Sequence, residues 1–199
     1  MILRQVNNKI ITEPKWKKWV VETTKPIFTP KLCKEIIDLN TELEKEKGKI
    51  SRPDENKLDL KIRKSTISFI PFDKMKNVYG DINNLVQKIN RNNFGFDGIQ
   101  LTEQAQITEY QKDNFYGWHT DTAIDMSDEP PVRKISMTVL LNDPSEFEGG
   151  DLEIANLTMK PMKQGHAAIF ASFLQHQVKP VTKGVRRSLV MWFGGKPFK

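Results

Sequence analysis

The sequence has little of the residue types that mark several common classes of protein. Its single cysteine, Cys33, cannot form an internal disulfide and lacks the cysteine or histidine neighbours that a structural zinc site requires. No segment approaches the roughly 20 consecutive apolar residues of a membrane span. Because the amino-terminal segment also becomes polar too early for a signal peptide, we expect a cytoplasmic protein with no membrane association.

Internal repeats and low-complexity tracts are absent as well, which argues against solenoid and disordered chains. The 199 residues fit one ordinary domain, and a content of 38% hydrophobic and 28% charged residues is typical of a folded chain with a core. We therefore expect a single domain that spans residues 1–199.

Acidic residues are slightly outnumbered, since 31 lysines and arginines face 25 aspartates and glutamates and give a net charge of +6. The lysines alternate with acidic and apolar residues and form no long basic tract. A solvated surface explains this pattern more simply than a nucleic-acid footprint does. The charge favours an acidic partner without identifying one.

A strand and a helix are predicted at the start of the chain. After a strand within residues 16–28, Thr29 can cap a helix that has Pro30 at its first position. Apolar residues recur on one face of this helix, and the polar segment 44–49 ends it. The apolar residues are Leu32, Ile36, Ile37, Leu39 and Leu43.

Strands and a second helix follow. Alternating apolar residues within 58–70 predict one or two strands. A helix is predicted over residues 73–92, with Asp73 as its cap and an apolar stripe at a 3.6-residue period. The stripe consists of Val78, Ile82, Leu85, Val86 and Ile89.

In the second half, short strand patterns alternate with turns rich in glycine, proline, asparagine and aspartate. Helices that precede many strands indicate an α+β domain, in which two helices buttress a β-sandwich or an open barrel. We expect residues 1–95 to form the helical support with flanking strands, and residues 96–199 to form the core. The predicted strand segments of this half are 99–110, 133–143, 150–157, 166–173 and 186–193.

His119 and Asp121 form the first part of a candidate metal site. The chain has only three histidines, and one of them begins the sequence His119-Thr120-Asp121. Side chains two apart on a strand point to the same face, so an imidazole and a carboxylate at this spacing can bind one ion from one side. Two histidines and one carboxylate on one face of an octahedral ion are the ligand set of non-haem Fe(II) oxygenases.

His176 is a better candidate than His166 for the third ligand. It begins a segment that contains Arg186 ten residues later, and a buried guanidinium can bind the far carboxylate of a dicarboxylate cosubstrate. Ser188 lies on the same face of that strand and can donate another hydrogen bond to this carboxylate. His166 is expected to be a solvent-facing residue at the start of a strand.

The aromatic residues near these positions have two interpretations. Tyr110 either places a phenol in the pocket or is an ordinary half-buried strand tyrosine. Tyr116 and Trp118 either line a substrate groove or serve the fold alone, and Trp192 is expected in the core.

Two further segments lie beside the candidate ligands. Gly149-Gly150 is expected to form a tight turn that shapes the backbone and takes no part in the chemistry. Residues 122–133, which are polar and contain paired prolines, are the expected mobile element. Neither this loop nor residues 48–57 carries a specificity signal in the sequence.

Several blocks of the second half resemble the prolyl hydroxylase group of 2-oxoglutarate/Fe(II) oxygenases, especially the bacterial and phage PKHD-type hydroxylases. The similarity runs through most of residues 104–193, and the blocks occur in the right order, whereas residues 1–100 contain no identifiable motif. The blocks are Tyr110, Phe115–Asp121, Ser136–Pro144, Phe147–Leu152, Gly165, Phe170, Ser172, His176, Val178, Pro180-Val181, Gly184, Arg186, Ser188 and Trp192.

The resemblance implies a double-stranded β-helix, or jelly roll, with N-terminal supporting helices and iron at its open mouth. The implied catalytic residues, which hold the iron, are His119, Asp121 and His176. The implied 2-oxoglutarate-binding residues are Arg186, Ser188 and Tyr110. Several prolyl hydroxylases have a tyrosine where this chain has Leu140, so that hydrogen bond to the cosubstrate is missing or comes from Tyr110.

The implied reaction is the oxidative decarboxylation of 2-oxoglutarate by O2 to succinate and CO2, coupled to hydroxylation of a C–H bond. Fe(II) is the implied metal, and an ascorbate requirement is expected by resemblance only. The leading substrate is a prolyl residue in a peptide or protein, since this is the substrate class of the enzymes that the sequence resembles.

Three alternatives stay open. The first is a free amino acid or another small molecule as substrate. Nucleic-acid demethylation is less favoured, because those enzymes have a second arginine several residues after the cosubstrate arginine and residues 189–195 contain none. The last is a binding module that kept the fold without turnover, which iron-dependent consumption of 2-oxoglutarate would exclude.

Overall fold

The computed structural model describes residues 3–6, 9–12, 19–52, 55–57, 59–122, 131–155, 157–159 and 162–198. Within these ranges, no helix combines the length and the apolar character that a membrane span needs.

The larger of two main β-sheets has eight strands, and the paired strands within it are antiparallel. In hydrogen-bonded order the strands are β3 (Val20–Glu22), β16 (Ala167–Ala171), β12 (Val132–Leu140), β19 (Arg186–Gly195), β10 (Ala105–Tyr110), β8 (Thr66–Ile70) and β4 (Glu46–Lys47), and β9 (Gln100–Leu101) also pairs with β19.

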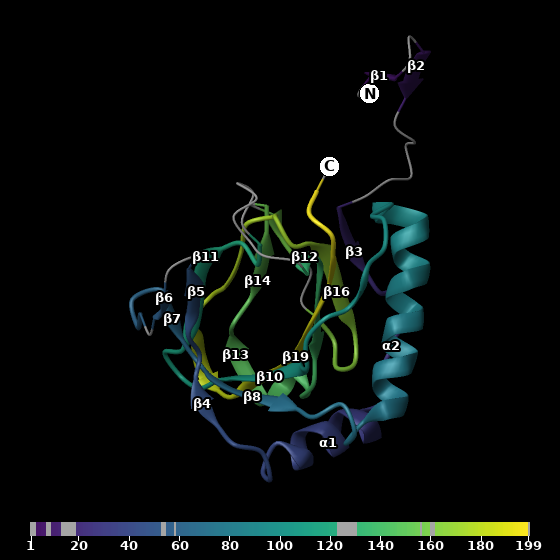
Figure 1. Ribbon diagram of the computed structural model, residues 1–199. Coiled ribbons are helices and arrows are strands. Elements are labelled where there is room, and N and C mark those ends of the chain that lie inside the picture. The colour runs from purple at the N-terminus through teal and green to yellow at the C-terminus, as the bar shows by residue number, and fades with distance from the viewer. Residues whose placement is uncertain are drawn as a thin grey trace.

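The smaller main sheet faces the larger one and has five strands (Figure 1). Its order is β15 (Leu157–Thr158), β14 (Leu152–Ile154), β17 (His176–Val178), β11 (Phe115–His119) and β7 (Arg63–Lys64). Three further sheets have two strands each: β1 (Leu3–Val6) with β2 (Lys9–Thr12), β5 (Ile50–Arg52) with β6 (Glu55–Lys57), and β13 (Phe147–Gly149) with β18 (Val181–Gly184).

Two helices, α1 (Pro30–Leu39) and α2 (Lys76–Ile89), lie on the outer side of the barrel-like body (Figure 1). They pack against the apolar face of the larger sheet and form the main core with it. Cys33 is fully buried in this core, as expected for a small hydrophobe, and burial raises the pKa of its thiol to about 11. The α+β arrangement with two supporting helices is confirmed.

The opposite face of the larger sheet points to the interior between the sheets. Because side chains alternate along a strand, the residues between the helix-facing ones point inward. Many of these inward residues are polar and yet buried, which is the lining expected of a site for a polar ligand. They are Gln106, Thr108, Ser136, Thr138, Arg186 and Ser188.

The first helix begins as predicted but ends early. Thr29 is its N-cap and accepts a hydrogen bond from the Leu32 backbone N–H at 3.2 Å. The prediction that 44–49 ends the helix is wrong, since it stops at Leu39. Asn40 accepts a hydrogen bond from Ser68 in β8, and this contact turns the chain out of the helix so that β4 can pair with β8.

The second helix has its predicted stripe but not its predicted cap. Asp73 lies in a turn, in which the Lys74 N–H donates to the carbonyl of Pro71 at 3.1 Å, so α2 begins later, with Met75 at the N-cap position. A single π-helical turn, η1 (Asn90–Phe94), follows it.

The strand prediction for 58–70 holds only for its second half, in β7 and β8. Leu58 lies outside the described residues, and the chain up to Ile62 forms a turn. The Asp59 carboxylate accepts a hydrogen bond from the Lys61 N–H at 2.9 Å, which favours a turn over a strand.

Four strands of the first 95 residues, β3, β4, β7 and β8, belong to the two main sheets. Residues 1–95, predicted as the helical support, and residues 96–199, predicted as the core, therefore both contribute strands to the two main sheets. The five strand segments predicted after residue 95 are all present, and a short 3-10 helix, η2 (Pro144–Glu146), lies between β12 and β13.

Candidate active site

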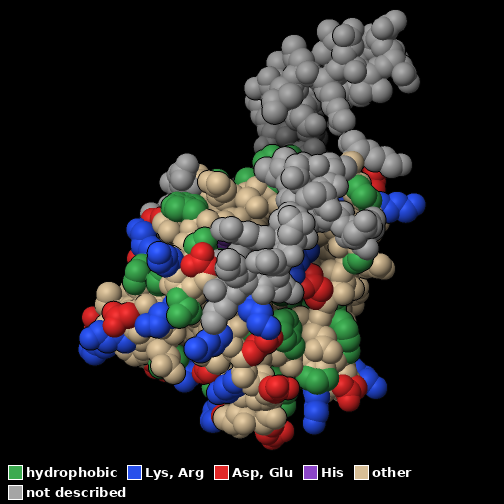
Figure 2. Space-filling view, turned by 60° about the vertical axis from the view of Figure 1, so that its left-hand side comes forward, with side chains coloured by type: hydrophobic (Ala, Val, Ile, Leu, Met, Phe, Trp, Pro, Cys, Tyr) green, Lys and Arg blue, Asp and Glu red, His purple; other side chains and the backbone are tan. Residues whose placement is uncertain are grey.

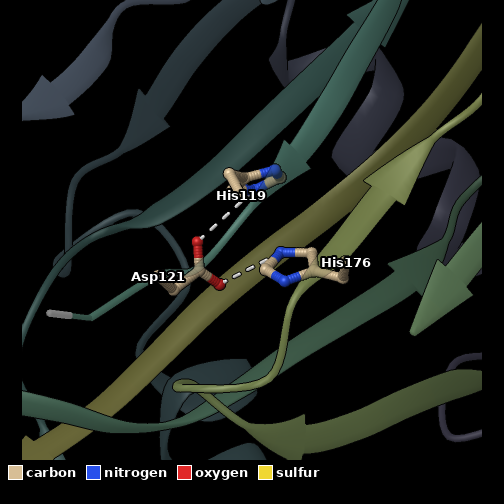
Figure 3. A group of neighbouring side chains, drawn as sticks. All are labelled: His119, Asp121 and His176. Carbon is tan, nitrogen blue, oxygen red and sulfur yellow. Dashed lines mark ion pairs between the residues drawn. The ribbon is translucent and has the colours of Figure 1, made fainter. Parts of the chain in front are cut away.

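Three side chains with metal-binding atoms converge in the interior (Figure 3). His119 ends β11 and His176 begins β17, and the two residues are direct partners across these antiparallel strands. The Asp121 carboxylate points between the two rings, with Oδ1 3.8 Å from His119 Nε2 and Oδ2 3.5 Å from His176 Nε2. The possible ligand atoms of all three lie within 4.8 Å of one another.

Asp121 reaches this position in a way that the sequence did not predict. It does not share a strand with His119, since β11 ends at His119 and Asp121 lies in a bend beyond it. Its backbone N–H donates to the Ser172 carbonyl at 2.9 Å, and the Ser136 hydroxyl donates to Oδ2 at 2.6 Å. Neighbouring strands of the larger sheet therefore fix the carboxylate.

Both imidazoles present the same nitrogen to the centre. His119 Nδ1 lies 2.8 Å from the Gly117 carbonyl, and His176 Nδ1 lies 3.0 Å from the Leu174 carbonyl. Because a carbonyl oxygen only accepts, Nδ1 carries the proton in each neutral ring and Nε2 keeps its lone pair. A hydrogen bond from Nδ1–H to a backbone carbonyl is typical of histidines that bind a metal through Nε2, because it fixes the orientation of the ring.

The charge states also suit a cation. Burial and the neighbouring His176 lower the pKa of His119 to about 3. Burial alone would raise the pKa of Asp121, but the two imidazoles, Arg133 and the Ser136 hydroxyl outweigh it, and this pKa lies below its usual range. At neutral pH the site therefore offers a neutral His119 ring and an ionised carboxylate.

The pKa of His119 predicts a pH-dependent stability for the metal-free protein. An unfolded histidine takes up its proton near pH 6.5, roughly, whereas folded His119 stays neutral down to about pH 3. Stability should therefore fall as the pH drops below the unfolded value, by at most about 1.4 kcal/mol per pH unit from this group.

Urea unfolding of metal-free protein at several pH values from roughly 7 to 5 measures this slope. The lowered pKa of Asp121 changes the stability only at lower pH and does not contribute to the slope in this pH range. His119→Gln should flatten the slope, and an unchanged slope in that variant would contradict the assignment.

The three donors fit one metal ion. Two adjacent ligands at roughly 2.1 Å from a shared ion lie roughly 3 Å apart, which is close to the 3.5 and 3.8 Å separations of the carboxylate oxygens from the two nitrogens. Two imidazoles and one carboxylate on one side leave the other positions of an octahedral ion open, which is the arrangement of non-haem Fe(II) sites.

Ser136→Ala should weaken metal binding without unfolding the protein. The variant loses the hydrogen bond that orients the Asp121 carboxylate, and the loss of such an outer partner costs roughly 10- to 100-fold in metal affinity. Anaerobic titration with Fe(II) measures the effect. Ser145→Ala, which removes an exposed hydroxyl from η2, is the matched control, and equal affinities of the two variants would refute a role for Ser136.

Arg186 is buried in the same interior. It begins β19 opposite Tyr110 of β10, and only 3% of it is exposed. Its Nη1 donates to Ser188 Oγ at 3.3 Å. Among the residues that the structure describes, no carboxylate lies within ion-pair distance of Arg186, so the guanidinium is available to an anionic ligand.

Tyr110 lies beside this guanidinium. Its ring centre is 5.9 Å from Arg186 Cζ, and the side chain is 4% exposed. Burial raises the pKa of its phenol, so the hydroxyl stays protonated and can donate a hydrogen bond. The ring is more deeply buried than an ordinary half-buried strand tyrosine.

A pocket leads to Arg186. Leu140, for which the resemblance implied a tyrosine in several prolyl hydroxylases, forms part of its wall. Gly150 has a φ of 71°, and a Cβ atom there would lie 2.7 Å from Arg186 Cδ, so this glycine makes room for the arginine as well as shaping the turn. The remaining lining residues are Pro144, Phe147, Gly149, Asp151, Leu152, Met159 and Met162.

The other predicted residues lie outside this group. His166 precedes β16, is half-buried rather than solvent-facing, and places Nδ1 2.9 Å from the Thr23 carbonyl. Trp192 is buried as expected, whereas Trp118 is 40% exposed. Most of the loop 122–133 lies outside the described residues.

Sequence reasoning missed two polar residues of the site. Ser136 and Arg63 come from strands far apart in the sequence, and neither has a spacing to the ligands that marks it. Arg63 is buried and its Cζ lies 4.5 Å from the centre of the Tyr116 ring, which stacks on His119 with 3.4 Å between centroids. The only sequence signal that could have indicated them is a polar residue at a strand position that is expected to face the interior.

The sequence model of the 2OG-Fe(II) oxygenase superfamily matches residues 105–194, which include the three candidate metal ligands and Arg186. Among curated proteins, a PKHD-type hydroxylase from Azoarcus sp. (strain BH72) is 40% identical over 84 residues, or 40% of this chain and 37% of its own length. Another, from Prochlorococcus marinus, is 31% identical over 129 residues, or 62% of this chain and 57% of its own. The matches thus cover less than two thirds of these relatives.

Solved structures show the same fold. A prolyl-4-hydroxylase from Pseudomonas putida superimposes with a TM-score of 0.68 at 19% identity, over 90% of this chain and 94% of its own. A prolyl hydroxylase from Trichoplax adhaerens, in complex with a peptide of a hypoxia-inducible factor, also gives 0.68, at 17% identity over 89% and 84%. The fold is a double-stranded β-helix, as the resemblance implied.

Proposed function

We propose that this chain, of which residues 105–194 match the sequence model of the 2OG-Fe(II) oxygenase superfamily, is an Fe(II)- and 2-oxoglutarate-dependent dioxygenase that hydroxylates prolyl residues in a peptide or protein. One observation carries the proposal: two histidines and one aspartate share one interior with a buried arginine that makes no ion pair with any described residue. A dicarboxylate cosubstrate needs this combination, because one end binds the metal and the other needs a positive charge.

The roles of the residues follow from this geometry. His119 and His176 would hold Fe(II) through Nε2, and Asp121 through its carboxylate, which Ser136 keeps in place. Arg186 would bind the far carboxylate of 2-oxoglutarate, with Ser188 beside it. Tyr110 would donate the hydrogen bond that Leu140 cannot supply.

When bound, Fe(II) and 2-oxoglutarate supply the activation of O2, with succinate and CO2 as coproducts and one oxygen atom transferred to the substrate. The protein would position the cosubstrate and the substrate. Buried apolar residues of both sheets line part of the interior and would limit the access of water to it. They include Leu152, Ile154, Phe170 and Val178.

The substrate assignment rests on the relatives. The curated relatives are PKHD-type hydroxylases, and the solved structures include prolyl hydroxylases, one of them with a bound peptide. A free amino acid is the second candidate. A nucleic-acid substrate is not favoured, since Figure 2 shows basic and acidic side chains interspersed on the face in view and no continuous basic stripe there.

Mass spectrometry of candidate substrates tests this assignment. Protein with Fe(II) and 2-oxoglutarate is given isotopically labelled O2 and a proline-rich peptide, the same peptide with alanine for proline, or free L-proline. Label in the proline-rich peptide alone supports prolyl hydroxylation. Label in free L-proline alone would move the assignment to a small molecule, and equal labelling of both peptides would contradict a prolyl target.

A further inference from the structure

Arg63 is a second buried arginine beside the proposed iron site. It begins β7, is 7% exposed, and is the direct cross-strand partner of Tyr116. The guanidinium carbon lies 4.5 Å from the centre of the Tyr116 ring, which in turn stacks on His119. Arg63 also lies close enough to Tyr110 for its charge to lower the pKa of that phenol, against the larger effect of burial. Its charge therefore acts in the interior.

Among the side chains that the structure describes, none is an acidic partner of this charge. Arg63 Nε donates to Ser65 Oγ at 2.9 Å and Nη1 donates to the Lys49 carbonyl at 2.9 Å, and both acceptors are neutral. No carboxylate of the described segments lies within ion-pair distance of it. Arg187, by contrast, is paired with Glu109 at 2.7 Å. A guanidinium has further N–H donors that these two bonds do not use.

Arg186 has the same combination of features, and the proposed function accounts for it. A buried cation without an anion is costly, so such a residue is expected where a ligand supplies the missing charge. The charges of Fe(II), 2-oxoglutarate, Asp121 and Arg186 cancel one another. Arg63 is then left as a positive charge beside the proposed iron site that neither a described residue nor the cosubstrate balances.

We propose that Arg63 binds a carboxylate of the substrate, so that the hydroxylated molecule is acidic close to its target carbon. This inference rests on the proposed function and names the substrate class of that site. A planar guanidinium matches a carboxylate with two parallel hydrogen bonds, and the net charge of +6 favours the approach of an acidic partner. The carboxylate has two sources: an aspartate or glutamate side chain of a peptide, or the α-carboxylate of a free amino acid.

Anaerobic calorimetric titration of the protein with Fe(II) and 2-oxoglutarate tests the proposal without turnover. In one arm, a single glutamate is moved through the positions that flank a central proline in a peptide, and each peptide is compared with its glutamine counterpart. The other arm compares free L-proline with L-prolinamide. In one of the two arms, the compound with the carboxylate should bind roughly 10- to 100-fold more tightly than its amide counterpart. The arm that shows this preference identifies whether the carboxylate belongs to a peptide side chain or to a free amino acid.

Variants of β7 complete the test. Arg63→Gln should abolish the preference for the acid, and Arg63→Lys should keep part of it, because lysine retains the charge and loses the planar geometry. Lys64→Gln, which changes the exposed neighbour on the same strand, should leave it intact. Thermal unfolding and Fe(II) affinity of each variant show whether the fold and the metal site are kept.

Three results would overturn the proposal: no preference for an acid in either arm, a preference that survives in Arg63→Gln, or an equal loss of acid and amide binding with weakened Fe(II) affinity. The last result would make Arg63 a support for Tyr116 and His119. Failure of the proposed oxygenase function would show separately, as a lack of Fe(II)-dependent succinate formation, since binding is measured here without O2.

Discussion

His176→Ala should abolish turnover, whereas His166→Ala should leave it near the wild-type rate. His176 supplies one of three metal-binding atoms, so its loss should cost more than the roughly 100-fold that removal of an outer partner costs. His166 interacts with the Thr23 carbonyl at the edge of the larger sheet and does not belong to the metal-binding group. Succinate formation from 2-oxoglutarate measures both variants, and Fe(II) titration shows whether binding is lost.

The two histidines form a matched pair, because each has Nδ1 beside a backbone carbonyl and only one faces Asp121. Equal loss of activity in both variants would refute the assignment of the ligands. It would indicate that activity responds to the fold in general and not to the metal site.

Arg186→Ala should raise the apparent Michaelis constant for 2-oxoglutarate by roughly 10- to 100-fold, because the far carboxylate loses charge-assisted hydrogen bonds. The measurement is the rate of succinate formation as a function of 2-oxoglutarate concentration. Arg186→Lys should give a smaller increase, since it keeps the charge in the pocket but not the planar pair of donors.

Arg187→Ala is the matched control. Arg187 is the next residue on β19, but it points to the opposite face and pairs with Glu109. Its removal should affect stability slightly and leave the Michaelis constant unchanged. An unchanged constant in Arg186→Ala would place the anchor for 2-oxoglutarate elsewhere, with Arg63 as the next candidate.

The parts of the fold that local chemistry dictates were predictable from the sequence. The cap at Thr29 and the apolar stripe of α2 depend on residues a few positions apart. The end of α1 and the start of α2 were not predictable, because Asn40 bonds to Ser68 in a distant strand and a turn displaces the helix from Asp73. A contact with a distant strand lies at the first boundary, and a local turn at residues 71–74 precedes the second.

The same division holds for the site. Spacing and residue type were enough to select His119, Asp121, His176 and Arg186, and the structure brings the first three together. The position of Asp121 beyond the strand depends on Ser136 and on the Ser172 carbonyl, which only the register of the larger sheet brings near. For the same reason the sequence did not identify Arg63, because its proposed role depends on the pairing of β7 with β11.

Formation of succinate by anaerobically purified protein, given Fe(II) and 2-oxoglutarate and then air, is the direct test of the proposed dioxygenase. We expect Fe(II)-dependent succinate that rises when a proline-rich peptide is added, and none in His176→Ala. Succinate formation that does not increase with any peptide would support the oxygenase activity and argue against a prolyl residue of a peptide as the substrate. No succinate from the wild-type protein under any of these conditions would contradict the account and leave a binding role for the fold.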